Sequence, residues 1–338
     1  MKIAINGFGR IGRIFFRQTF GYPNFEIIAI NDLSDPQNLA YLLKYDTVYG
    51  PYEKSVEVKD NKLIVDGKEI LIFKETDPTK LPWKDLDIDV VVEATGVFTE
   101  YEKAKTHLAA GAKRVVITAP TKDEITPTFT PGLEDLAKIS SLGETEFITS
   151  NASCTTNSVN PVLAILMKRI GIKKAILTTI HAYTATQNLV DGIVKGHDFR
   201  RGRAAGLNIV PSTTGAAEAT VRVIPLLKGK FDGISIRVPV ICGSLSDITV
   251  LTERPTTVEE INNIFKEEAQ KPEWQGILKV IEEEIVSSDI LKEPYGAIVD
   301  LTLTRVVDGD LVKVFSWYDN EWGYCAMLIK HILSLFKY

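Results

Sequence analysis

The first 32 residues of the chain carry the pattern that most constrains its fold. They read as a short apolar strand, "KIAING", a helix with apolar residues at helical spacing, "RIGRIFFRQTF", and a second strand, "FEIIAIND". Gly7, Gly9 and Gly12 lie where the first strand passes into the helix, and Asp32 ends the second strand. This strand–helix–strand unit predicts a parallel sheet of the α/β class.

The three glycines follow the G-x-G-x-x-G spacing, and each has a separate physical use. Gly7 permits the tight turn, Gly9 lets the backbone approach a pyrophosphate, and Gly12 allows the helix to pack closely on the strand. The helix N-terminus supplies amide donors and partial positive charge to the phosphates. Asp32 suits the ribose hydroxyls of NAD and repels the 2′-phosphate of NADP. The sequence therefore predicts a Rossmann-type dinucleotide-binding domain with NAD as cofactor.

Two later runs, "DIDVVVEATG" and "RVVITAP", are continuous and rich in β-branched residues, as is typical of parallel strands buried on both faces. Thr95 and Gly96 follow the first of these strands, at the sheet edge where ligands bind. A cofactor contact and a plain strand-to-helix turn are about equally compatible with that position.

Beyond "EFITSNASCTTNS" the strand-like segments alternate apolar and polar residues, which predicts a second domain with a mostly antiparallel sheet. We expect a dinucleotide-binding domain over residues 1–153, completed by a C-terminal helical segment at 319–338. Residues 154–318 then form an α+β catalytic domain.

Composition excludes several classes of function. The net charge of −5 does not suggest nucleic acid as the main partner, and no apolar run approaches the roughly 20 residues of a membrane helix. No secretory leader is visible, and three scattered cysteines suggest neither a disulfide framework nor a metal site. We expect a cytoplasmic protein that binds no metal.

One cysteine, Cys154 in "SNASCTTNS", lies among small polar residues at or just before a predicted helix. A helix N-terminus favours an anion and lowers a thiol pKa, so Cys154 is a candidate nucleophile. His181, one of four histidines, follows an alternating strand and is a candidate general base. On residue type alone, a passive cysteine and a core histidine remain the commoner interpretation.

A Cys–His pair fits two reactions. A cysteine hydrolase needs no dinucleotide domain, whereas oxidation of an aldehyde through a thioester does. The two halves of the sequence together therefore favour an NAD-dependent aldehyde dehydrogenase.

The whole chain resembles the phosphorylating glyceraldehyde-3-phosphate dehydrogenase family. The resemblance rests on stretches in the family's order, above all "INGFGRIGR", "SNASCTTN", "HAYTATQ", "FRRGRAA", "PSTTGAA" and "WYDNEWGY". It implies oxidation of glyceraldehyde 3-phosphate with NAD and inorganic phosphate, in glycolysis, by a homotetramer.

The resemblance also implies residue roles. Cys154 matches the nucleophile and His181 the base. The residues that match substrate or phosphate contacts are Ser153, Thr155, Thr184, Arg200, Thr214, Gly215 and Arg237, with Arg201 as a rival to Arg200. Those that match cofactor contacts are Gly7, Gly9, Arg10, Ile11, Gly12, Asp32, Thr95, Gly96, Thr118, Asn320 and Tyr324.

The chain departs from the family pattern at two notable positions. Ser158 stands where many members have a second cysteine, and Thr76 stands where an arginine is usual. Two other functions stay open: erythrose-4-phosphate dehydrogenase, which releases its acyl group to water, and a non-catalytic binding or redox-sensing role. Retention of "STTGAA" favours a site for attacking phosphate.

Overall fold

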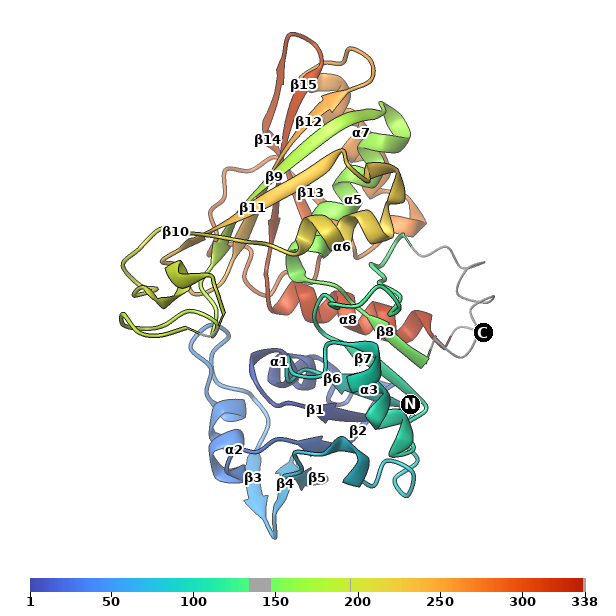
Figure 1. Cartoon of the computed structure of the whole chain (residues 1–338), viewed down its shortest axis with the longest axis vertical. Helices are drawn as coiled ribbons and strands as arrows, with labels where there is room; N and C mark the ends of the chain where they lie inside the picture. The colour runs from blue at the N-terminus through green and yellow to red at the C-terminus, as the bar shows by residue number, and fades with distance from the viewer. Residues whose placement is uncertain (134–146, 195, 337–338) are drawn as a thin grey trace. The chain divides into compact units, whose positions relative to one another are not determined.

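The computed structural model describes residues 1–133, 147–194 and 196–336 (Figure 1). The chain divides into two compact units. Unit 1 holds the described residues of Met1–Phe129, Glu134–Ala152 and Leu328–Tyr338, and unit 2 holds Thr130–Leu133 and those of Ser153–Met327. The division between Ala152 and Ser153 falls one residue before the boundary expected from the sequence. The C-terminal part of unit 1 begins at Leu328, nine residues after the expected start at 319.

Unit 1 is built on an eight-stranded sheet in the order β3-β4-β5-β2-β1-β6-β7-β8. In this sheet order, each neighbouring pair from β5 through β2, β1, β6 and β7 to β8 is parallel. The strands β3 and β4 add an antiparallel edge beside β5. The strands are β1 (Lys2–Asn6), β2 (Glu26–Asn31), β3 (Val56–Lys59), β4 (Lys62–Val65), β5 (Lys68–Phe73), β6 (Val90–Glu93), β7 (Arg114–Ile117) and β8 (Ile148–Ser150). The helices are α1 (Arg10–Thr19), α2 (Pro36–Lys44) and α3 (Tyr101–Ala109), with the short 3-10 helix η1 (Pro78–Lys80).

The antiparallel edge of this sheet follows from its turn residues. Asp60 and Asn61 join β3 to β4, and Asp66 and Gly67 join β4 to β5. All four have positive φ, which two-residue hairpin turns require and which Asn, Asp and Gly tolerate best. Both turns therefore suit the antiparallel pairing of β3, β4 and β5.

Unit 2 contains a seven-stranded sheet in the order β10-β11-β9-β12-β15-β14-β13. Its pairs are antiparallel except β11–β9 and β13–β14, so the sheet is mostly antiparallel as expected. The strands are β9 (Ile172–Ala182), β10 (Val210–Ser212), β11 (Phe231–Val238), β12 (Ser244–Thr252), β13 (Leu278–Ile281), β14 (Ala297–Val307) and β15 (Leu311–Tyr318). The predicted fold class is confirmed for both sheets.

The α-helices that lie wholly in unit 2 are α5 (Cys154–Arg169), α6 (Ala216–Val223) and α7 (Val258–Ala269). Its 3-10 helices are η3 (Phe199–Gly202), η4 (Pro225–Leu227) and η5 (Pro272–Trp274). The last helix, α8 (Trp322–Ser334), is shared, because its residues from Leu328 onward belong to unit 1. In the described part of the chain no helix is long and apolar enough to span a membrane.

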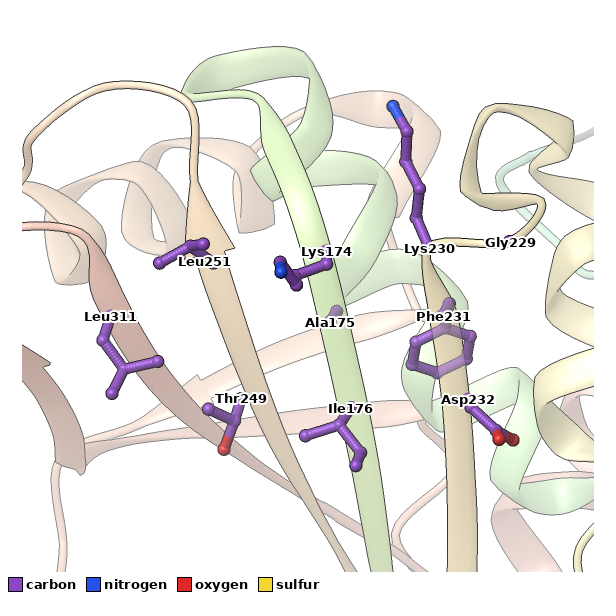
Figure 2. Close-up of a pocket in the computed structure, with 10 residues that line it drawn as sticks. All are labelled: Lys174, Ala175, Ile176, Gly229, Lys230, Phe231, Asp232, Thr249, Leu251 and Leu311. Carbon is purple, nitrogen blue, oxygen red and sulfur yellow. The ribbon is translucent and has the colours of Figure 1, made fainter.

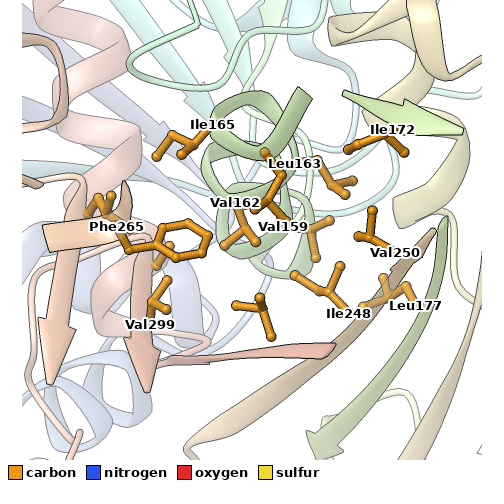
Figure 3. Close-up of a cluster of buried hydrophobic side chains, with 14 of the residues drawn as sticks. Val159, Val162, Leu163, Ile165, Ile172, Leu177, Ile248, Val250, Phe265 and Val299 are labelled. Carbon is orange, nitrogen blue, oxygen red and sulfur yellow. The ribbon is translucent and has the colours of Figure 1, made fainter. Parts of the chain in front are cut away.

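The core of unit 2 holds α5 on the sheet (Figure 3). Val159, Val162 and Leu163 of α5 are fully buried, and they belong to one cluster with Ile248 and Val250 of β12. Burial of each such side chain stabilises the fold by about 1.5–3 kcal/mol. This packing fixes the helix whose first residue is Cys154.

Candidate active site

The turn between β1 and α1 requires two of its three glycines. Gly7 has a φ of +92°, and a Cβ there would lie 2.7 Å from the Ala94 carbonyl carbon. A Cβ on Gly12 would lie 2.2 Å from the Gly7 carbonyl oxygen. A Cβ on Gly9 would have no atom of the described residues within 4 Å, so open space borders the backbone where a pyrophosphate would approach.

A cavity of about 490 Å³ lies beside this turn in unit 1. It is lined by Asn6, Gly7, Gly9, Asn31, Asp32, Leu33, Glu75, Thr76, Ala94, Thr95, Val97 and Phe98. The Asp32 carboxylate accepts hydrogen bonds from the backbone N–H of Phe8 at 2.8 Å and of Ser34 at 2.9 Å. These bonds hold Asp32 at the cavity wall and leave its oxygens able to accept ribose hydroxyls.

The residues of unit 1 fit a dinucleotide. The α1 N-cap is Gly9, which makes no side-chain cap bond at this helix start, and a helix N-terminus favours an anion. Arg10 pairs with Asp46, which directs its guanidinium to a protein carboxylate. Thr118 donates to the Glu93 carbonyl oxygen at 3.0 Å, and Gly96 adopts a φ of +72° in the exposed loop after β6.

Unit 2 brings the two predicted catalytic side chains together. Cys154 is the first residue of α5, and His181 is the penultimate residue of β9. The Cys154 Sγ lies 3.4 Å from the His181 Nε2. Ser153 caps α5 through a bond from the Thr156 N–H at 3.0 Å, so the thiol lies at a capped helix start.

The other nitrogen of His181, Nδ1, has two close partners. It lies 2.7 Å from the Ala182 carbonyl oxygen and 2.7 Å from the Arg237 Nη1. A carbonyl oxygen only accepts and a guanidinium only donates, so these two contacts ask opposite roles of Nδ1. Burial lowers the pKa of His181 to about 3, and the nearby Arg237 guanidinium adds to that shift. The imidazole is therefore neutral and can accept a proton.

Opposing effects act on the Cys154 thiol. Burial is the larger and raises its pKa, while the Arg237 guanidinium and the Thr155 backbone N–H lower it. The helix start alone predicts a lowered pKa for Cys154. In the structure, desolvation outweighs the helix terminus, and the pair is uncharged until His181 accepts the thiol proton.

Arginine side chains border this pair. The Arg237 Nη1 lies 2.7 Å from the His181 Nδ1 and donates to the Ala182 carbonyl at 3.1 Å. Arg201 donates to Thr186 Oγ1 at 3.1 Å, and Thr186 in turn bonds Thr184 Oγ1 at 2.9 Å.

The structure distinguishes Arg201 from Arg200, which the sequence could not. Arg201 is partly buried and also bonds the Thr213 carbonyl oxygen, next to Thr214. Its charge lowers the pKa of both His181 and Arg237, which places it near the pair. Arg200 is exposed. Arg201 is therefore the better candidate for an anion contact.

The other predicted phosphate contacts lie at helix starts. Gly215 is the N-cap of α6, and Thr214 Oγ1 accepts a bond from the Ala216 N–H at 3.1 Å. Thr155, in the first turn of α5, bonds the Tyr318 hydroxyl at 2.8 Å. Tyr318 also bonds Thr179 at 2.8 Å and so ties α5 to β9. No role could be predicted for Tyr318 from the sequence, because there it is only one residue of a strand-like segment whose apolar and polar residues alternate.

The side-chain oxygen of Asn320 already accepts hydrogen bonds within the protein. Its Oδ1 accepts bonds from the Gly243 N–H at 3.1 Å and the Ser244 hydroxyl at 2.9 Å. The orientation leaves Nδ2 as the donor for a ligand carbonyl. Tyr324, four residues on, is buried. Among the described residues, no cluster of His, Cys, Asp or Glu could hold a metal ion.

Comparison with known proteins decides the family. Residues 1–101 match the model of the glyceraldehyde 3-phosphate dehydrogenase NAD binding domain, and residues 153–320 match that of its C-terminal domain. The glyceraldehyde-3-phosphate dehydrogenase of Thermotoga maritima is 49% identical over 338 residues, covering 99% of both chains. That of Clostridium pasteurianum is 48% identical over 333 residues, covering 97% of this chain and 96% of the relative.

The chain belongs to the glyceraldehyde-3-phosphate dehydrogenase family. The predicted resemblance is thereby confirmed, and so are the dehydrogenase function and the NAD cofactor. The glyceraldehyde-3-phosphate dehydrogenase of Borreliella burgdorferi, 47% identical over all of both chains, agrees. The roles of single residues stay predictions.

Proposed function

We propose that Cys154 is the nucleophile that carries the acyl group and that His181 is its general base. One observation carries this proposal: the Cys154 Sγ lies 3.4 Å from the Nε2 of His181, whose lowered pKa of about 3 leaves the imidazole neutral. As sulfur bonds the aldehyde carbon, the thiol proton passes to Nε2 and the carbonyl electrons move to oxygen. The amides at the start of α5 stabilise that oxyanion.

The proton on His181 then completes the hemithioacetal hydroxyl, and Nε2 is again free. NAD, when held by this chain, would supply the acceptor for the hydride that leaves the hemithioacetal carbon. His181 takes the hydroxyl proton in the same step, so a thioester remains on Cys154. The residues that hold NAD are the Gly7–Gly12 turn, Asp32 and the loop at Thr95, with the Asn320 Nδ2 as donor to the nicotinamide carboxamide.

Two groups of side chains serve the phosphates. Arg237 and Thr184 bind the substrate's phosphate, and Arg201 with Thr214 and the Gly215 backbone binds inorganic phosphate. Guanidinium and hydroxyl groups suit phosphate oxygens because they donate several charge-assisted hydrogen bonds. Attack of inorganic phosphate on the thioester expels the Cys154 thiolate, which recovers its proton from His181. The product is 1,3-bisphosphoglycerate.

The same proposal includes a homotetramer, for which an apolar face of unit 2 offers an interface (Figure 2). A groove of about 710 Å³ runs over β9, β11, β12 and β15, and its lining includes Ile176 and Leu311. These side chains are 58% and 43% exposed, and Ile234 on β11 is 52% exposed. Exposed apolar patches of this kind mark interaction surfaces. Light scattering measures the mass of the assembly in solution, and the Ile176→Glu variant should form an assembly of lower mass than the wild-type protein.

We also place the protein in the cytoplasm. All three cysteines, Cys154, Cys242 and Cys325, are free thiols, which supports a reducing compartment. Fractionation of cells that express the protein tests this placement.

One assay tests the reaction. Glyceraldehyde 3-phosphate and NAD should give sustained NADH formation only with phosphate or arsenate, because thioester release needs the attacking anion. Rapid turnover without either anion would contradict phosphorolysis. Faster turnover of erythrose 4-phosphate, independent of phosphate, would favour the hydrolytic alternative, and equal rates with NADP would contradict the role of Asp32.

A further inference from the structure

A buried carboxylate in unit 1 has partners that the reaction described above does not use. Glu93 ends β6 and is 1% exposed. Its Oε2 accepts from the Asn6 Nδ2 at 2.5 Å and contacts the His107 Nε2 at 3.1 Å. Its Oε1 accepts from both the backbone N–H, at 2.9 Å, and the hydroxyl of Thr95. Four donors therefore converge on one side chain.

The proton positions on one side of Glu93 are fixed by a tryptophan. The Trp83 indole N–H, which can only donate, lies 3.1 Å from the His107 Nδ1. Nδ1 must therefore accept, so the neutral imidazole carries its proton on Nε2 and donates to Glu93. Trp83 and His107 are both fully buried, so no water substitutes for either partner.

The orientation on the other side is fixed by a backbone amide. The Glu75 N–H donates to the Asn31 Oδ1 at 2.8 Å. Hence the Asn31 Nδ2 is the donor to the Asn6 Oδ1, at 2.7 Å. That bond leaves the Asn6 Nδ2 to face Glu93. Reversing the Asn6 or Asn31 amide would set two donors or two acceptors against each other. In the assigned arrangement the Asn6 Nδ2 and the His107 Nε2, 3.2 Å apart, both donate to the Glu93 Oε2.

The ends of this network lie in the cofactor cavity. Asn6, Asn31, Glu75 and Thr95 all line the cavity of about 490 Å³, whereas Glu93 is absent from its lining. The carboxylate thus lies behind the wall and sets the side chains that form it. We propose that Trp83 and His107 are positioning residues for NAD: through Glu93 they hold Asn6 and the 94–97 loop in the form that receives the dinucleotide.

A purely structural role would have a different signature. Removal of a buried hydrogen-bond partner lowers stability wherever it lies, but only a positioning network links that change to NAD affinity. The readouts are therefore the Kd for NAD by calorimetry, well below the midpoint of thermal unfolding, and the KM for NAD against kcat. The proposal concerns cofactor binding, so its failure would leave the thioester chemistry of Cys154 untouched.

Two variants of His107 make a matched pair. His107→Leu removes the donor to Glu93 and the acceptor for Trp83, and it should raise the Kd for NAD about ten-fold, since a lost buried hydrogen bond costs about 1–3 kcal/mol. His107→Gln can place an amide N–H toward Glu93 and an oxygen toward Trp83, so it should restore most of the affinity. In both variants kcat at saturating NAD should stay within about two-fold of wild type.

Trp83→Phe is the smallest perturbation, because it keeps an aromatic ring and removes the indole N–H. It should raise the Kd for NAD several-fold in a folded protein. Glu93→Gln keeps the shape but brings an amide N–H against existing donors, so it should weaken NAD binding at least as much.

His331→Leu is the control, because His331 is buried in unit 1 with bonds to Thr149 and Asn151, outside this network. It should lower the melting temperature and leave the Kd for NAD unchanged. If Trp83→Phe and His107→Leu also bind NAD with wild-type Kd while their melting temperatures fall, the network is only part of the core and the proposal is overturned. Should His107→Leu fail to fold, Trp83→Phe alone decides.

Discussion

Two buried histidines, one in each unit, have different partners at Nε2. His107 of α3 accepts from the Trp83 indole at Nδ1 and donates from Nε2 to the Glu93 carboxylate. His181 of β9 has its Nδ1 beside both the Ala182 carbonyl and the Arg237 guanidinium, and its Nε2 lies 3.4 Å from the Cys154 Sγ. Both rings are almost fully buried, so burial does not separate them.

The two histidines differ in the group that contacts Nε2. At His107 that group is a carboxylate, which has no proton to give to the ring. At His181 the partner is a thiol, which can give up its proton to the ring. The comparison teaches that a buried histidine becomes reactive through an exchangeable proton at its second nitrogen, and that the same geometry with a fixed acceptor serves to position its surroundings.

The largest expected effect comes from removing the Cys154 thiol, which supplies the exchangeable proton. Cys154→Ala should lower kcat by roughly 10⁴-fold or more, since loss of a nucleophile removes the covalent route. The Kd for NAD should change little. Cys325→Ala, which removes a fully buried thiol, should keep activity within a few-fold. Steady-state assays decide, and an active Cys154→Ala variant would contradict the assignment of the nucleophile.

Removal of the base should have the next largest effect. His181→Asn should lower kcat/KM by about 10²- to 10⁴-fold, the usual contribution of a positioned base. It should also slow alkylation of Cys154 at pH 7, because the thiol loses its acceptor. His107→Gln is the contrast and should keep both rates near wild type. Equal losses of kcat/KM in His181→Asn and His107→Gln would show that the two histidines do not differ in function.

The two adjacent arginines offer a smaller effect. Arg201→Ala should raise the KM for inorganic phosphate by about 10- to 100-fold, because a charge-assisted hydrogen bond contributes about 1.5–3 kcal/mol. Arg200→Ala should leave that KM within about two-fold, since Arg200 is exposed. Initial rates over a series of phosphate concentrations measure both. The reverse order would restore Arg200 as the phosphate contact.

The smallest effect concerns the helix start that holds the thiol. Ser153→Ala removes the cap of α5 and should lower the free energy of unfolding by about 1 kcal/mol. Ser153→Thr keeps a hydroxyl acceptor and should recover most of that loss. Chemical denaturation measures both variants. Equal stability of Ser153→Ala and wild type would show that packing alone fixes the start of α5.

Local patterns made much of this molecule predictable. Gly7 and Gly12 are recognisable because the turn and the close packing of α1 allow no other residue, and their spacing is short. Cys154 stands out because a strand ends and a helix begins around it. In each case the physical constraint lies within a few residues of sequence.

Other features join residues that are far apart. Glu93, His107 and Trp83 come from a strand, a helix and a loop, and no local spacing links them. Arg200 and Arg201 are neighbours in η3, a 3-10 helix of 4 residues that is too short for a sequence period to show which side chain faces inward. The thiol pKa depends on burial, which the sequence around Cys154 does not report.

The most direct test is a single-turnover experiment without phosphate. Enzyme mixed with glyceraldehyde 3-phosphate and NAD should release about one equivalent of NADH per active site and then stop. Peptide mass spectrometry should find the acyl group on Cys154, and the burst should be far slower in His181→Asn. A burst with the adduct on another residue, or a full burst in Cys154→Ala, would contradict the account.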